Sequence, residues 1–322
     1  MTMPDAYGRT INYLRLSITD RCNLRCRYCM PETGVVQKNC ADILRYEEFL
    51  RIVTAATELG IRKIRVTGGE PLVRKGVIGF LAQLATLPDI DEVALTTNGM
   101  LLAGQAQALK DSGVGCLNVS LDSLNGKTYA EITRGGDLER VLAGLDEAQA
   151  CGLKIKLNMV VMRGVNDHEL LPFAALSLDK PWAIRFIEYM PAIREPDWRR
   201  NLVSGAEILA ELGRKYPIEA LSGGRYCGPA KPYRIAGALG TLGMITPMSE
   251  HFCSSCNRIR VTSTGAAKSC IFNDDSVDLK PWLNNPLKLR HTLVQVISAK
   301  PAQHHFGTGL ANREFTMSNI GG

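Results

Sequence analysis

Polar and apolar residues alternate in short stretches that are separated by longer amphipathic ones along the first 190 residues. Six short stretches predict strands, at 14–18, 63–67, 93–97, 117–121, 154–161 and 183–188. Helical spacing of apolar residues predicts helices at 46–59, 103–111 and 138–150, each followed closely by a Gly. Alternating strands and helices favour parallel pairing with right-handed crossovers. Six units are too few to close a full barrel. The pattern therefore predicts an α/β fold with a partial (β/α)6 TIM-like barrel, although a doubly wound open sheet fits the periodicity equally well.

The predicted strands have one polar and one apolar face. In the strand at 63–67, Lys63, Arg65 and Thr67 share one face, whereas parallel strands covered on both faces by helices are apolar throughout. A buried row of unpaired cations would be costly. The pattern therefore favours a wide, water-filled lumen that holds a polar, anionic ligand; the alternative is a face open to solvent. The polar-face residues are Arg15, Lys63, Arg65, Asn118, Ser120, Lys156 and Asn158.

The regular alternation ends near residue 190. A charged loop at 194–201, a helix at 206–215 and a Gly-rich region at 222–247 follow. We interpret residues 1–190 as the barrel and residues 191–322 as a smaller C-terminal domain packed against its open side.

Composition and charge narrow the class of protein. Hydrophobic residues make up 45% and charged residues 22% of the chain, as in ordinary globular proteins. No apolar run approaches the roughly 20 residues of a membrane span, and the N-terminus lacks a secretory h-region. We therefore expect a cytoplasmic protein without a membrane partner. The net charge of +6 without a long basic run suits an anionic small molecule and does not call for nucleic acid.

The first candidate site is a cysteine triad with the spacing C-x3-C-x2-C, formed by Cys22, Cys26 and Cys29. Three thiolates can hold a 4Fe–4S cluster through three of its irons and leave the fourth iron open. An open iron can bind another molecule and does not only relay electrons. The triad therefore predicts a cluster with a reactive coordination position.

A second triad, Cys253, Cys256 and Cys270, has the spacing C-x2-C-x13-C. By itself it fits zinc, with His251 as a candidate fourth ligand, as well as it fits an iron–sulfur cluster. The first triad favours a second cluster. Arg258 and Arg260 share a strand face and could clamp phosphates, unless that face is simply solvated.

Several motifs resemble known families. The first triad with Tyr28 resembles the cluster loop of the radical S-adenosylmethionine (SAM) superfamily, and Gly68-Gly69-Glu70 resembles the segment of that superfamily that meets the SAM amino group. From about residue 13 to residue 322 the chain resembles the GTP 3′,8-cyclase family, most specifically in the second triad followed by Asn-Arg-x-Arg. Residues 266–269 and the loop at 194–200 depart from the family pattern.

The resemblance implies a radical SAM lyase that converts GTP to (8S)-3′,8-cyclo-7,8-dihydroguanosine 5′-triphosphate, the first step of molybdenum cofactor biosynthesis. It implies two 4Fe–4S clusters, one on each triad, with SAM on the open iron of the first and guanine on that of the second. The radical derived from SAM would take hydrogen from the ribose C3′, and that carbon would attack guanine C8.

The resemblance also implies residue roles. The SAM site would contain Tyr28, Gly69, Glu70, Ser120 and Met190. The GTP site would contain Arg15, Lys63, Arg65, Thr96, Lys156, Arg185, Arg258 and Arg260, although Thr96 could equally face SAM. The catalytic residues would be Arg15, Arg258, Arg260, Gly321 and Gly322. Without the resemblance, the Gly-Gly tail would be interpreted as an ordinary frayed terminus.

Implied partners are reduced flavodoxin or a similar electron donor, the next enzyme of the pathway (cyclic pyranopterin monophosphate synthase), and a second copy of the chain in a homodimer. Two other functions remain open. One is a peptide-modifying radical SAM enzyme with an auxiliary cluster, although such enzymes usually carry more cysteines there. The other is a zinc-binding nucleic-acid module, which leaves Gly68-Gly69-Glu70 without a role.

Overall fold

The computed structural model describes residues 3–190, 197–223, 228–273 and 275–304. Six parallel strands form its centre. They are β1 (Tyr13–Ser17), β2 (Lys63–Thr67), β3 (Glu92–Thr97), β4 (Cys116–Ser120), β5 (Lys154–Val161) and β6 (Ala183–Glu188). The six predicted strands are confirmed with ends shifted by at most one residue, because alternation of polar and apolar residues marks a strand that lines a lumen.

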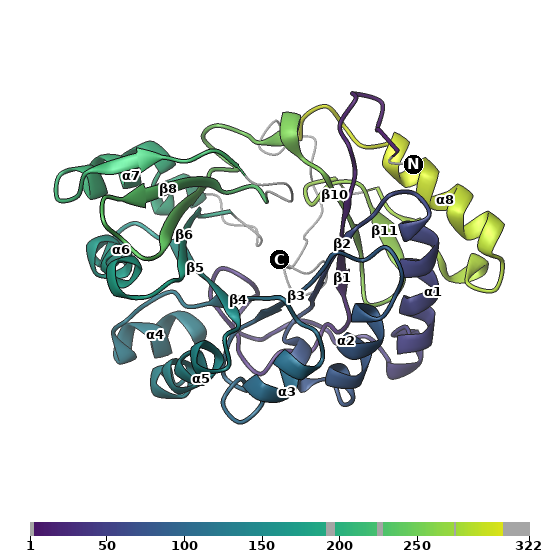
Figure 1. The fold of residues 1–322 in the computed structure, drawn as a ribbon, viewed down its shortest axis with the longest axis horizontal. Helices are drawn as coiled ribbons and strands as arrows, with labels where there is room; N and C mark the ends of the chain where they lie inside the picture. The colour runs from purple at the N-terminus through teal and green to yellow at the C-terminus, as the bar shows by residue number, and fades with distance from the viewer. Residues whose placement is uncertain (1–2, 191–196, 224–227, 274, 305–322) are drawn as a thin grey trace.

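Helices cover the outer face of the curved sheet (Figure 1). They are α1 (Tyr46–Thr57), α2 (Val77–Ala85), α3 (Ala106–Asp111), α4 (Gly126–Thr133), α5 (Leu138–Ala150), α6 (Leu170–Asp179), α7 (Gly205–Gly213) and α8 (Pro286–Ser298). Helices α2, α4, α6 and α8 were not predicted from the sequence. The first of these, VIGFLAQLA, is mostly apolar and contains a Gly, so its helical periodicity is weak.

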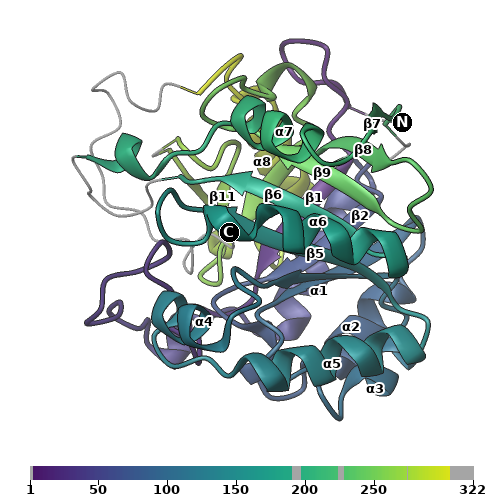
Figure 2. The ribbon, with the colours of Figure 1, turned by 90° about the vertical axis from the view of Figure 1, so that its left-hand side faces the viewer.

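The chain after residue 190 adds strands to both edges of the same sheet. These strands are β7 (Ile218–Ala220), β8 (Lys231–Ile235), β9 (Thr241–Ile245), β10 (Arg258–Val261), β11 (Ala266–Lys268) and β12 (Val277–Asp278). The twelve strands run in the order β12-β11-β10-β1-β2-β3-β4-β5-β6-β9-β8-β7. Strand β9 pairs in parallel with β6, as Figure 2 shows, and β10 pairs in parallel with β1. The barrel is therefore partial and open, as predicted, and C-terminal strands extend it on both sides.

The two faces of the central strands have different environments. Leu14 and Leu16 are fully buried toward the helices, while Arg15, Lys63 and Arg65 on the inner face are 8%, 3% and 8% exposed. The inner polar face is thus enclosed, and the alternative of a face open to solvent is wrong.

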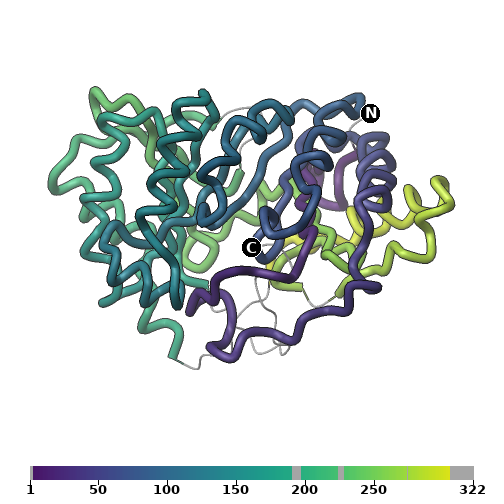
Figure 3. The backbone as a smooth tube through the Cα atoms, turned by 90° about the horizontal axis from the view of Figure 1, so that it is seen from below, coloured from purple at the N-terminus to yellow at the C-terminus, as the bar shows by residue number. Residues whose placement is uncertain are grey.

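The long segment between β1 and α1, drawn in purple, runs along one side of the barrel in Figure 3. It carries the first cysteine triad. Across the described ranges, every helix is too short or too polar to cross a lipid bilayer.

Candidate functional site

One cavity inside the curved sheet is lined by both cysteine triads. Most of the predicted SAM and GTP residues share this lining. The predicted residues found there are Arg15, Cys22, Cys26, Tyr28, Cys29, Arg65, Gly69, Thr96, Ser120, Arg185, Met190, Cys253, Cys256, Arg258, Arg260 and Cys270. The fold therefore joins two motifs that lie more than 220 residues apart in the sequence.

The loop of the first triad is attached to the end of β2 by backbone hydrogen bonds. The Gly69 N–H donates to the Thr19 carbonyl over 2.8 Å, and the Glu70 N–H donates to the Arg21 carbonyl over 2.8 Å. The approach is so close that a Cβ atom on Gly69 would lie 2.3 Å from the Arg21 carbonyl oxygen. Glycine is required here because any side chain would push the triad loop away.

Replacing Gly69 by Ala is expected to lower cluster assembly on the first triad by at least half. Overpacking at such a site costs roughly 1–3 kcal/mol, and the loop that carries Cys22 is the segment that must move. Iron per chain after anaerobic reconstitution measures the effect. The matched control is Gly79→Ala in α2, where an added Cβ meets nothing within 4 Å. Equal iron in both variants would contradict the prediction.

The structure places Glu70 outside the cavity lining. Its side chain is fully buried, and its carboxylate accepts hydrogen bonds from the Leu72 N–H at 2.9 Å, the Thr97 hydroxyl at 3.0 Å and the Asn98 N–H at 2.6 Å. Glu70 therefore joins the ends of β2 and β3, and the contact with SAM that the resemblance implied stays a prediction. Its backbone N–H, and not its carboxylate, holds the triad loop.

Burial raises the pKa of Glu70 to about 7, against the lowering effect of its three hydrogen bonds. The folded chain then keeps a proton that the unfolded chain loses near its ordinary pKa of 4.5. The stability from this group is present at low pH and is lost as pH rises through about 7. Wild type should thus lose about 3 kcal/mol relative to Glu70→Gln between roughly pH 4 and pH 8.

Denaturant unfolding of the metal-free chain at several pH values checks this result. The exposed Glu131 supplies the control, because Glu131→Gln should follow the wild-type curve. Parallel curves for wild type and Glu70→Gln would refute the titration of Glu70.

The first triad has a buried acidic neighbour that the sequence analysis missed. Asp122, just after β4, accepts a hydrogen bond from the Tyr28 hydroxyl at 2.8 Å and one from the Val160 N–H at 2.9 Å. Burial raises the pKa of Cys26 well above its usual value, and Asp122 and Cys29 raise it further. Bound metal would relieve this repulsion, because it stabilises thiolates. A polar residue directly after a predicted strand was the signal that could have identified Asp122.

The second triad surrounds the start of β10. Cys253 begins a short helical turn, η5 (Cys253–Ser255), Cys256 follows it, and Cys270 comes after β11. Burial raises the pKa of the Cys256 thiol, but Arg258 and Lys300 outweigh it and bring the pKa to about 7. This positive environment suits a thiolate ligand.

Each triad offers three cysteines to the cavity, and three thiolates are the donor set of a 4Fe–4S cluster that keeps one iron open. Within the described residues, no three His, Cys, Asp or Glu side chains are placed to hold a single metal ion.

A row of arginines on the inner face of the sheet lines the same cavity as the two triads. Arg15 of β1 lies opposite Arg65 of β2 and Arg260 of β10. Burial, followed by the charge of Arg260, holds the pKa of Arg15 well below its usual value. Burial and the charge of Arg65 lower the pKa of Arg185 to about 10. The Nε atoms of Arg65 and Arg258 are buried without a hydrogen-bond partner in the described structure. Because these positively charged arginines are buried close to one another, they favour the binding of an anionic ligand.

Lys63 and Lys156, also predicted to bind GTP, lie outside the cavity lining. The Lys63 ammonium pairs with Glu92 at 2.9 Å and lies 5.3 Å from the ring centre of Tyr13. Arg65 and Arg258 each lie 5.5 Å from the same ring. Tyr13, which lay outside the predicted strand at 14–18 and had no predicted role, thus stabilises these cations through cation–π contacts.

Other predicted features cannot be placed. Gly321 and Gly322 lie outside the described residues, as do residues 194–196 of the charged loop.

Comparison with known proteins agrees with this geometry. A family model described as the Radical SAM superfamily matches residues 16–176, and one described as Molybdenum Cofactor Synthesis C matches residues 182–306. The GTP 3′,8-cyclase of Geobacter sulfurreducens is 51% identical over 326 residues, covering 100% of both chains. That of Pelotomaculum thermopropionicum is 46% identical and covers 99% of this chain and 100% of the relative.

A solved structure supports the fold. Streptococcus suis SuiB bound to S-adenosylmethionine superposes with a TM-score of 0.64 at 15% identity, covering 92% of this chain and 68% of SuiB. At that identity the likeness concerns the fold alone. The full-length relatives decide the family: this chain belongs to the GTP 3′,8-cyclase family of the radical SAM superfamily.

Proposed function

We propose that this protein converts GTP to (8S)-3′,8-cyclo-7,8-dihydroguanosine 5′-triphosphate, the first step of molybdenum cofactor biosynthesis. The observation that carries the proposal is one cavity lined by both cysteine triads and by the arginine row. A one-cluster enzyme would not need the second triad, and a zinc module would not need the enclosed cavity.

The first triad would hold a 4Fe–4S cluster with SAM beside it. When bound, the reduced cluster supplies the electron that cleaves SAM and starts the radical chemistry. Tyr28, Gly69, Ser120 and Met190 line the cavity and would orient SAM. Asp122 accepts a hydrogen bond from the Tyr28 hydroxyl and thereby fixes its position. These residues would also exclude water from the reacting atoms.

The second triad would hold the second cluster, with the guanine ring of GTP on its open iron. The triphosphate is expected to bind Arg15, Arg65, Arg258 and Arg260, whose planar guanidinium groups suit phosphate oxygens. Thr96 and Arg185 line the same cavity and would complete the nucleotide site. Lys63 and Lys156, which do not line the cavity, would make the electrostatic potential inside it more positive. A catalytic role for Gly321 and Gly322 stays a prediction.

Anaerobic reconstitution followed by a SAM cleavage assay tests the proposal. We expect about eight irons per chain, and 5′-deoxyadenosine formation that rises with GTP, together with a cyclised product of unchanged nucleotide mass. Stoichiometric zinc, or SAM cleavage indifferent to GTP, would overturn it.

The remaining predictions concern partners and organisation. They are an electron donor of the flavodoxin type, the synthase that uses the product, a homodimer, a cytoplasmic location, and the division of the chain at residue 190. The two family models meet between residues 176 and 182, close to that division.

A further inference from the structure

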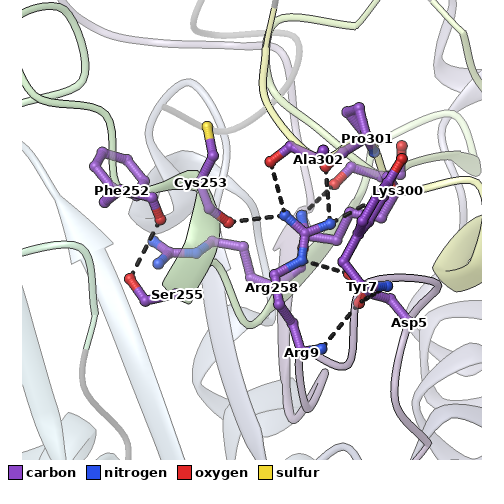
Figure 4. Close-up of polar contacts among 11 residues, drawn as sticks. Asp5, Tyr7, Arg9, Phe252, Cys253, Ser255, Arg258, Lys300, Pro301 and Ala302 are labelled. Atoms are coloured by element: carbon purple, nitrogen blue, oxygen red, sulfur yellow. Dashed lines mark hydrogen bonds and ion pairs between the residues drawn. The ribbon is translucent and has the colours of Figure 1, made fainter.

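Arg9, before the first strand, lies against the second triad at the other end of the sequence (Figure 4). Its guanidinium donates to the Cys253 carbonyl at 2.7 Å. It also donates to three successive carbonyls just after α8. These are Lys300 at 3.4 Å, Pro301 at 2.8 Å and Ala302 at 3.3 Å.

Asp5 completes the environment of Arg9. The Asp5 carboxylate accepts from the Arg9 Nε at 2.5 Å and from the Arg9 backbone N–H at 2.9 Å. Guanidinium offers five N–H donors, and with Asp5 and the four carbonyls each of them has an acceptor. Arg9 is only 8% exposed, so this arrangement is a buried, fully hydrogen-bonded hub and not a surface contact.

Lys300 extends the hub to the other two cysteines. Its ammonium donates to the Arg258 carbonyl at 2.9 Å and to the Ser269 carbonyl at 2.7 Å. Ser269 directly precedes Cys270, and Arg258 lies two residues after Cys256. The positive charge of Lys300 also lowers the pKa of the Cys256 thiol. Lys300 is 3% exposed and lines the cavity. Arg9 therefore holds the Cys253 carbonyl itself, and Lys300 holds the carbonyls one residue before Cys270 and two residues after Cys256.

We propose that Arg9 and Lys300 are positioning residues that hold the three cysteines of the second triad at the spacing its cluster requires. The inference rests on the proposed second cluster. Cys253 and Cys256 belong to a short turn and Cys270 follows a three-residue strand, so little regular structure fixes them relative to one another. Charge-assisted hydrogen bonds to the Cys253 carbonyl, and to the Arg258 and Ser269 carbonyls close to the other two cysteines, supply that restraint. The geometry of metal ligands depends on such groups behind the ligands.

The alternative is that the hub only attaches the N-terminal segment and stabilises the whole fold. The two roles differ in which cluster they affect. A general loss of stability would lower iron on both triads, whereas a positioning role lowers iron on the second triad alone.

The test uses two full-length backgrounds. One has Cys22, Cys26 and Cys29 changed to Ala and keeps only the second triad; the other has Cys253, Cys256 and Cys270 changed to Ala and keeps only the first. Each background should bind about four irons per chain. Arg9→Lys and Lys300→Met are placed in both, because Lys keeps the charge of Arg9 but not its planar fork of donors.

We expect each substitution to lower iron at least threefold in the background that keeps the second triad and to leave the other background unchanged. The visible absorption and electron paramagnetic resonance spectra of the reduced cluster should change in the same background only. The matched control is Arg290→Gln, which removes an exposed ion pair between Arg290 of α8 and Glu58 and should change neither.

Equal iron loss in the two backgrounds, or none in either, would overturn the positioning role. Failure of the proposed function gives a different result. The unsubstituted background with only the second triad would then bind no 4Fe–4S cluster at all.

Discussion

Changing Cys253, Cys256 and Cys270 together to Ala is expected to abolish the cyclised product while the first cluster remains. The variant should keep about four irons per chain and should still cleave SAM slowly when reduced. Product formation should fall by at least about 10³-fold, because orientation of the reacting groups contributes effective molarities of roughly 10⁵ M or more. Iron analysis and mass spectrometry of the nucleotide measure the two effects.

The matched control for the triple variant replaces cysteines outside the cavity lining. Cys40 is exposed and Cys151 is half-buried, so changing both to Ala should leave iron and product at wild-type values. Cyclised product from the triple variant at more than about one-tenth of the wild-type rate would show that the second triad does not hold the substrate.

Arg15→Met is expected to reduce kcat/KM for GTP by between roughly thirtyfold and several thousandfold. Removing one partner of a buried, hydrogen-bonded charge pair costs about 2–5 kcal/mol. Arg15 lies between Arg65 and Arg260 in register, at the centre of the arginine row. The loss should appear in GTP-dependent product formation, whereas the slow SAM cleavage without GTP should not change.

A stability measurement separates this functional role from a folding role. Because burial and neighbouring cations lower the pKa of Arg15, its charge is unfavourable in the ligand-free chain. Arg15→Met should therefore unfold at a denaturant concentration no lower than wild type, as expected where function is obtained at the expense of stability. Arg140→Met, at an exposed position of α5, is the control for activity. A parallel loss of stability and activity in Arg15→Met would contradict a role in binding GTP.

Local pattern was sufficient for much of the barrel. The strand at 63–67 was placed without error, because Lys63, Arg65 and Thr67 alternate with two apolar residues and both faces have a distinct environment. Helix α6 was missed: it contains Pro172 in its first turn, and Pro in a sequence usually weakens a helix prediction.

The candidate site was predicted where its residues are short-range motifs. Tyr28 and Gly69, which the resemblance assigned to the SAM site, both line the cavity; their contact with SAM stays a prediction. Glu70 was assigned to SAM from the same motif, and this contact stays a prediction. The motif did not indicate that the Glu70 carboxylate accepts hydrogen bonds from Leu72, Thr97 and Asn98, because those donors come from the end of β3 and from the turn after Glu70.

By itself, the sequence determined the two triads, the polar inner face of the strands and the family. Each of these features depends on residue types that lie only a few positions apart in the chain. The tertiary structure alone decided that both triads line one cavity and that Arg9 reaches Cys253 across 244 positions. The physical reason is that these contacts depend on β10 pairing with β1. That pairing closes a loop of more than two hundred residues, and no local pattern in the sequence encodes which strand will occupy the free edge.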